Sequence, residues 1–135
     1  MPRGVRVAAA SFLLGFFLQG QAGSSVSLKE FVNEQNTQTR EKILNQEFDQ
    51  AVAEMVKPLR AAVDSKGVQK SEERQRRDTR RADRIQYIRE TYDSQKLANM
   101  ISDAYVRNPY QPLDKVLMTF MSLELKAQES AASRR

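Results

Sequence analysis

Arginine is concentrated in one short stretch of this chain. The segment SEERQRRDTRRADR, residues 71–84, holds six arginines within eleven residues, and Asp78 and Asp83 are the only acidic residues between them. A guanidinium group forms charge-assisted, two-pronged hydrogen bonds with carboxylates and phosphates. On a helical wheel all six arginines lie within an arc of about 160°, which predicts one basic helix face. The members of this arginine stripe are Arg74, Arg76, Arg77, Arg80, Arg81 and Arg84.

Several anionic partners fit such a stripe. Arginine contacts with a phosphate backbone supply nonspecific affinity for nucleic acid, but such sites usually add aromatic platforms. Here the nearest aromatic residue, Tyr87, lies at the edge of the stripe. Because a run of charges is most often a solvated face, we expect either that or contact with an acidic protein or anionic lipid headgroups, and we disfavour nucleic acid. The contact residues predicted on this helix are Arg74, Arg77, Arg80, Arg81, Arg84 and Tyr87.

The rest of the chain offers little catalytic chemistry. It has no cysteine and no histidine, which excludes disulfides, thiol nucleophiles, the common zinc sites and the usual general base. Paired carboxylates such as Glu72 and Glu73 lack a matching base or metal ligand. The methionines fall on apolar stripes, where core packing is their ordinary role, and we single out Met118 and Met121 as lining a partner groove. The sequence therefore predicts no enzyme, no cofactor and no metal site.

The N-terminal residues have the order of a secretory signal peptide. Two arginines precede an uncharged apolar run, residues 7–18, and the small residues Gly20 and Ala22 suit a cleavage between Ala22 and Gly23. As a helix the run would be about 18 Å long, against about 30 Å of membrane hydrocarbon. We therefore expect a cleaved signal peptide at 1–22. An uncleaved membrane anchor and an organellar presequence are the alternatives.

Helix is the secondary structure that the remaining sequence favours. Only two glycines follow residue 22, and no alternating run of β-branched residues is present. Apolar residues recur at helical spacing, and a shift in the phase of the apolar stripe predicts a break near Asp93. Pro58 stands inside another apolar stripe and predicts a kink there. We expect an all-α fold, a small bundle of four to five helices over residues 23–127, followed by a flexible tail at 128–135.

Several helix ends can be assigned from single residues. Ser27 and Glu30 form the pattern of a capping box, so a helix should begin near Leu28. Ser71, followed by two carboxylates, predicts the start of the arginine-bearing helix. Gly67 suits the left-handed position after a helix, and Pro112 suits the first position of the last helix.

Charge and size limit the function. The chain has 135 residues and a net charge of +5, from 22 basic and 17 acidic residues, so it is one small domain with a modest basic excess. We expect a non-enzymatic exported protein, periplasmic or secreted, that binds a protein with an acidic surface as an adaptor, chaperone-like factor or component of secretion machinery. The alternatives are an accessory subunit of a membrane complex, anchored by an uncleaved N-terminal helix, and a binder of nucleic acid or anionic headgroups. Homo-oligomerisation is left open.

Overall fold

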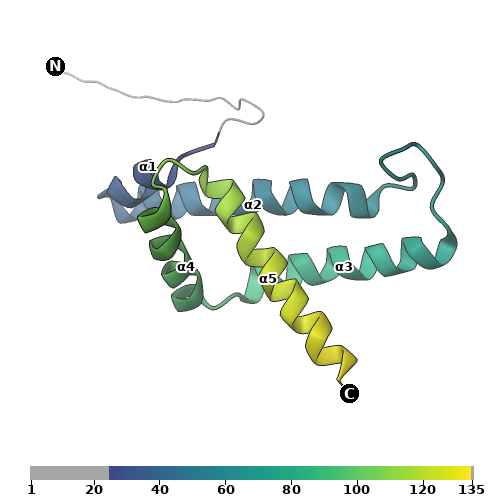
Figure 1. Ribbon diagram of the computed structural model, residues 1–135. Helices are drawn as coiled ribbons and strands as arrows, with labels where there is room; N and C mark the ends of the chain where they lie inside the picture. Colours follow the sequence, from purple (N-terminus) through teal and green to yellow (C-terminus); the bar gives the residue numbers. More distant parts are fainter. Residues whose placement is uncertain (1–24, 135) are drawn as a thin grey trace.

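The structure, a computed structural model, describes residues 25–134. The expected signal peptide at 1–22 lies outside the described residues. The described part is all-α, as the sequence predicts, and its helices are α1 (Leu28–Asn33), α2 (Thr37–Arg60), α3 (Glu72–Thr91), α4 (Ser94–Arg107) and α5 (Leu113–Ser133). The long helices α2 and α3 lie side by side and run in opposite directions, α5 crosses them, and α4 lies at one end (Figure 1).

Two helices begin where their capping residues predict. The Oγ atom of Ser27 accepts a hydrogen bond from the backbone N–H of Glu30 at 3.1 Å, and the Glu30 carboxylate accepts one from the N–H of Ser27 at 3.0 Å. This confirms the capping box at the start of α1. At the start of α3, Ser71 Oγ accepts from the N–H of Arg74 at 3.1 Å. The N-cap residue Ser71 therefore sets the start of α3, and with it the positions of the arginines along this helix.

The helical structure is interrupted between α3 and α4, where the apolar stripe moves to another side of the helix. α3 ends at Thr91 and α4 begins at Ser94. The side chain of Asp93 accepts hydrogen bonds from the N–H groups of Gln95 at 2.9 Å and Lys96 at 3.2 Å. Because the helix restarts here, the apolar stripes of both helices face the core, which one straight helix could not achieve.

Two helix ends differ from expectation. α2 ends at Arg60, so Gly67 lies in the following loop, in a turn where its φ is 81° and its N–H donates to the carbonyl of Asp64. Pro58 lies in the last turn of α2, and a kink there stays a prediction. At the other end of the molecule α5 includes residues 128–133, for which the sequence predicts a flexible tail. Alanine, glutamine and glutamate in this segment are strong helix formers, and they let α5 continue.

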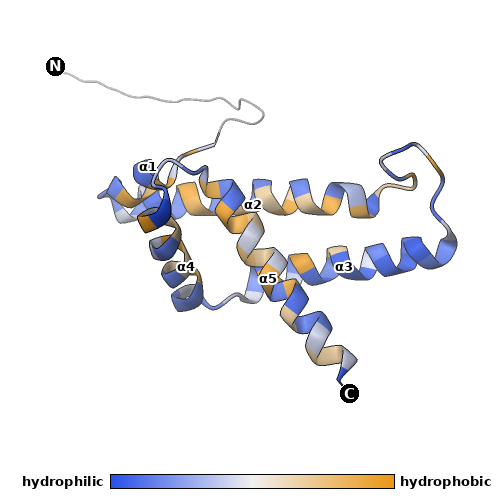
Figure 2. Ribbon diagram, in the orientation of Figure 1, coloured by the Kyte–Doolittle hydropathy of each residue, from blue (hydrophilic) through white to orange (hydrophobic). Residues whose placement is uncertain are grey.

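All five helices contribute to one hydrophobic core. The ring of Tyr92 packs between two buried phenylalanines, 4.9 Å from Phe48 and 6.2 Å from Phe120 by ring centroids. Hydrophobic residues gather along α2 and along the middle of α5, whereas the N-terminal half of α3 is hydrophilic (Figure 2). The largest side chains that are fully buried are Phe48, Phe120, Leu28, Ile85, Ile88, Leu97, Leu113, Leu117 and Met121.

Candidate functional site: an arginine cleft

The arginines of α3 line an open cleft. α5 crosses α3 and then projects beyond it (Figure 1). The residues that line the cleft come from α3, between Arg74 and Arg84, and from the last turns of α5. The cleft has a volume of about 850 Å³. We call it the arginine cleft, and its lining residues are Arg74, Arg77, Asp78, Arg80, Arg81, Arg84, Glu129, Ala132 and Ser133.

Positive charge is in excess within this cleft. On the α5 wall, the Glu129 carboxylate lies 2.8 Å from Nε of Arg81. Within the described residues, 25–134, Arg77, Arg80 and Arg84 have no ion-pair partner. Five guanidinium groups against two carboxylates leave an excess of three positive charges. Because the cleft is open, an incoming anion can reach these groups from solvent.

Helix dipoles act on the two walls in opposite ways. The first turn of α3 is the positive end of its dipole, where a cation such as Arg74 is unfavourable. The C-terminal end of α5 is the negative end of its dipole, and its C-cap residue is a cation, Arg134. Arg81 faces α5 because the carboxylate of Glu129 lies 2.8 Å from its Nε atom. The helix dipoles therefore do not account for the other arginines of the cleft.

A small apolar cavity adjoins the arginine cleft. Its volume is about 230 Å³, and Arg81 lines both spaces. Its other walls come from α2, α3 and α5, so it lies where these three helices meet. An acidic group bound at Arg81 would bring its neighbouring atoms to an apolar surface. The residues that line this apolar cavity are Met55, Pro58, Leu59, Arg81, Ile85, Ser122 and Leu125.

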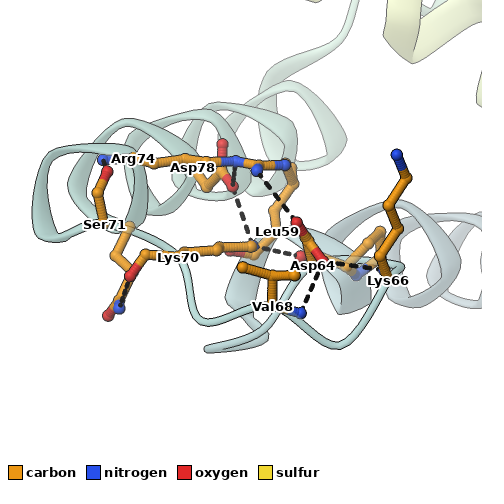
Figure 3. Close-up of polar contacts among 10 residues, drawn as sticks. Leu59, Asp64, Lys66, Val68, Lys70, Ser71, Arg74 and Asp78 are labelled. Atoms are coloured by element: carbon orange, nitrogen blue, oxygen red, sulfur yellow. Dashed lines mark hydrogen bonds and ion pairs between the residues drawn. The ribbon is translucent and has the colours of Figure 1, made fainter.

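A buried lysine fixes the helix that presents the arginines (Figure 3). The Nζ atom of Lys70 lies 2.9 Å from Oδ2 of Asp78 on α3, and it donates a hydrogen bond of 2.7 Å to the carbonyl of Pro58 on α2. Only 2% of the Lys70 side chain is exposed. Its ammonium group therefore satisfies a carbonyl at the C-terminal end of α2 and holds α3 against it.

The loop before α3 also constrains the first arginine of the cleft. Asp64 accepts hydrogen bonds from the backbone N–H groups of Lys66 at 2.9 Å and Val68 at 3.0 Å (Figure 3). The bonds from Val68 and Lys66 lower the pKa of the Asp64 carboxyl. Arg74 lies between two carboxylates, 3.8 Å from an oxygen of Asp64 and 3.8 Å from one of Asp78. Arg74 thus connects the loop to α3 through these two carboxylates, and it also lines the cleft.

The structure brings together five of the predicted contact residues, and it places the others elsewhere. Tyr87 is on α3 and 58% exposed, but it does not line the cleft. Arg76, the stripe member that was not predicted as a contact, does not line the cleft and pairs with Glu72 at 3.1 Å. Met118 is partly buried and packs against the core. Met121 is fully buried, so its prediction as a groove residue is wrong, because an apolar helix face also predicts plain core packing.

Four charged residues of the described chain are buried, and the sequence predicted the burial of none of them. They are Lys70 in the loop, Glu47 on α2, Asp78 on α3 and Asp114 in the first turn of α5. Glu47 stands four residues before the buried Ala51, and this helical spacing could have placed it on the core side. Lys70 lies outside any helix, where no periodicity indicates burial.

Comparison of the chain with known protein families, with curated proteins and with solved structures gives no match. Across residues 25–134, no helix combines the length and the apolar character needed to cross a bilayer. Nor do these residues contain a group of three or more acidic side chains that could hold a metal ion.

Proposed function

We propose that this chain is a non-enzymatic, exported helical protein that binds an acidic segment of a protein partner in the arginine cleft. The observation that carries the proposal is the excess of positive charge in one open cavity, with Arg77, Arg80 and Arg84 free of ion pairs among the described residues. Arginine side chains bind carboxylates through two parallel N–H donors. An adaptor or chaperone-like role requires no more than such a binding surface.

A protein segment suits the cleft better than a nucleic acid does. Sites for single-stranded nucleic acid combine basic residues with aromatic platforms, and no aromatic side chain among residues 25–134 lines this cleft. The apolar cavity beside Arg81 adds a surface for an aliphatic side chain. We therefore expect the preferred segment to carry several acidic residues and one apolar residue.

Long-range attraction is the main contribution that the cleft makes. Exposed ion pairs add about 0–1 kcal/mol each, whereas a field of one sign raises the rate of association strongly. Affinity should therefore fall with ionic strength. Specificity should depend on whether the apolar side chain reaches the cavity next to Arg81.

The test uses a fluorescently labelled ten-residue peptide of glutamates with one central leucine. We expect it to bind, and we expect the variant with Arg77, Arg80 and Arg84 replaced by glutamine to bind at least about tenfold more weakly, a loss of about 1.4 kcal/mol. These three positions leave the ion pairs of Arg74 and Arg81 intact. Fluorescence anisotropy at low and high salt measures both the affinity and its salt dependence.

A matched control removes three other cations. Replacing Lys42, Arg107 and Lys115 with glutamine makes the same change in net charge on exposed residues outside the cleft. We expect this control to bind the peptide nearly as well as the unmodified protein. Equal weakening by both triple variants would show that net charge alone is sensed, and it would refute a specific site. Tighter binding of an oligonucleotide of equal charge would favour the nucleic-acid alternative.

Export is part of the proposal and has its own test. The purified protein from a bacterial periplasm should have the intact mass of a chain that begins at Gly23, because Gly20 and Ala22 suit the cleavage. A chain that retains Met1 or Pro2 would instead support the anchored accessory subunit.

A further inference from the structure

Arg81 lies at the boundary between the arginine cleft and the apolar cavity. Its side chain lines both spaces and is 44% exposed, so a ligand can reach it from solvent. The other residues that line the apolar cavity are mainly aliphatic, and they include Met55 and Leu59 on α2 and Leu125 on α5. One guanidinium group therefore lies next to an apolar surface that three helices form.

The apolar cavity has the size of one side chain rather than of a whole ligand. Its volume is about 230 Å³, whereas pockets that enclose a small molecule measure about 300–1,000 Å³. Among residues 25–134, no charged residue other than Arg81 lines it, and Ser122 supplies the one hydroxyl group. The occupant that fits is therefore a single aliphatic side chain with an anionic group close to it.

The guanidinium group of Arg81 is held in place and still has donors to offer. Its Nε atom donates to Oε2 of Glu129 at 2.8 Å. Within the described residues, neither of its two terminal nitrogens has a hydrogen-bond or ion-pair partner. These two nitrogens can donate two parallel hydrogen bonds to one carboxylate. Glu129 thus orients the guanidinium group and leaves these donors to a ligand.

The C-terminal residue of a protein combines an anionic group and an apolar group on one atom. Its α-carboxylate and its side chain branch from the same carbon, so the first can bind Arg81 while the second enters the apolar cavity. Within an extended segment, by contrast, successive side chains point to opposite sides, so a glutamate next to a leucine faces away from it. An α-carboxylate also has no flexible side chain to immobilise, which lowers the entropic cost of binding.

We propose that the arginine cleft binds the C-terminus of an acidic protein partner, with the α-carboxylate on Arg81 and an aliphatic last side chain in the apolar cavity. The inference rests on the proposed function and narrows it to one kind of segment. The acidic residues before the terminus then lie among Arg77, Arg80 and Arg84, which have no ion-pair partner in the described chain. Glu129 carries the same charge as the ligand, but these three arginines outnumber it.

The experiment compares two peptides of equal net charge, each with an N-terminal fluorophore and a C-terminal leucine. The first has five glutamates before a leucine amide, and the second has one glutamine and four glutamates before a leucine with a free carboxylate. We expect the second to bind at least about tenfold more tightly in fluorescence anisotropy, because only it offers an α-carboxylate to Arg81. Equal affinities would overturn this inference and leave the binding of acidic segments intact. Failure of every acidic peptide to bind would instead refute the proposed function, so the two failures can be told apart.

Variants assign the preference to the two parts of the site. Arg81→Lys keeps the positive charge beside Glu129 but loses the planar pair of donors, so it should remove most of the preference for the free carboxylate. Ser122→Gln, at an exposed position that lines the apolar cavity, should narrow the cavity and weaken the binding of the free-carboxylate peptide. Ser102→Gln, at an exposed position of α4 that lines neither space, should leave its affinity unchanged. A preference that survives in full in both Arg81→Lys and Ser122→Gln would refute this placement of the terminus. The comparison of the two peptides needs no substitution, so it holds even where a variant fails to fold.

Discussion

Replacing the buried Lys70 with methionine is the sharpest test of how this fold is held together. The ammonium group lies 2.9 Å from Asp78 and 2.7 Å from the carbonyl of Pro58, and the side chain is 2% exposed. Methionine fills a similar volume but cannot donate a hydrogen bond. The change therefore leaves a buried carboxylate and a helix carbonyl without their donor, and the lost polar contacts dominate its effect.

Removal of one partner from a buried ion pair costs about 3–5 kcal/mol. Asp78 keeps Arg74 at 3.8 Å, and its side chain is 12% exposed, so part of its charge stays compensated. We therefore expect the lower end of that range, about 3 kcal/mol, for Lys70→Met. Urea denaturation followed by circular dichroism measures this loss as a lower midpoint at unchanged slope.

The double variant separates charge from packing. Replacing Lys70 with methionine and Asp78 with leucine together removes both charges, and buried pairs replaced by apolar residues often cost little. We expect the double variant to recover at least about 2 kcal/mol relative to the sum of the single changes. Lys66→Met, on an exposed residue of the same loop, should stay within about 0.5 kcal/mol. A Lys70→Met protein within about 1 kcal/mol of the unmodified one would refute this account of the loop.

Three further perturbations test single features of the fold. Gly67→Ala should destabilise the protein by about 1 kcal/mol, because a φ of 81° strains a residue with a side chain, although no atom lies near enough to clash with it. Gly67→Asn should cost less, because asparagine tolerates this conformation better. Equal urea midpoints for the unmodified protein and both variants would contradict this. Ser27→Ala should cost about 1 kcal/mol through loss of its cap, and an unchanged thermal melt would argue against the capping box. The raised pKa of Glu47 means that the folded state binds its proton at higher pH than the unfolded chain does, so stability falls as pH rises above 4.5. Glu47→Gln should therefore gain stability relative to the unmodified chain between pH 4 and 7, and a constant difference in urea midpoint across this range would refute it.

Local rules accounted for most helix starts. The side chains of Ser27, Ser71 and Asp93 act as caps, because a cap depends on residues within one turn. Apolar residues at helical spacing lie on the buried faces of the helices, and Ile85 and Ile88, which follow the arginines on α3, are examples. The end of α2 at Arg60 could not be predicted in the same way, because a loop contact with Lys70 helps to define it.

The sequence predicts only one wall of the candidate site, the one formed by α3. The stripe of arginines on α3 follows from 3.6-residue periodicity, but nothing in that periodicity indicates that Glu129 and Ser133 of α5 lie opposite. That wall depends on the crossing of α3 and α5, which is a property of tertiary packing. Burial of Glu47 and Asp114 has the same origin, since each becomes enclosed only when α2, α5 and the segment at Ser25 meet.

The arginine cleft and the buried lysine belong to one electrostatic arrangement. Asp78 pairs with the buried Lys70 and also lies near Arg74 of the cleft, so one carboxylate interacts with a cation of the interior and with a cation of the cleft. The lysine already engages much of the charge of Asp78, and this carboxylate therefore compensates the cleft less than its distance alone suggests. If Lys70 is replaced, Asp78 becomes available to Arg74 and to the other arginines around it. Lys70→Met should consequently weaken binding of the acidic peptide as well as folding, under conditions in which the variant stays folded. Unchanged peptide affinity in such a folded variant would show that the cleft does not depend on the buried pair.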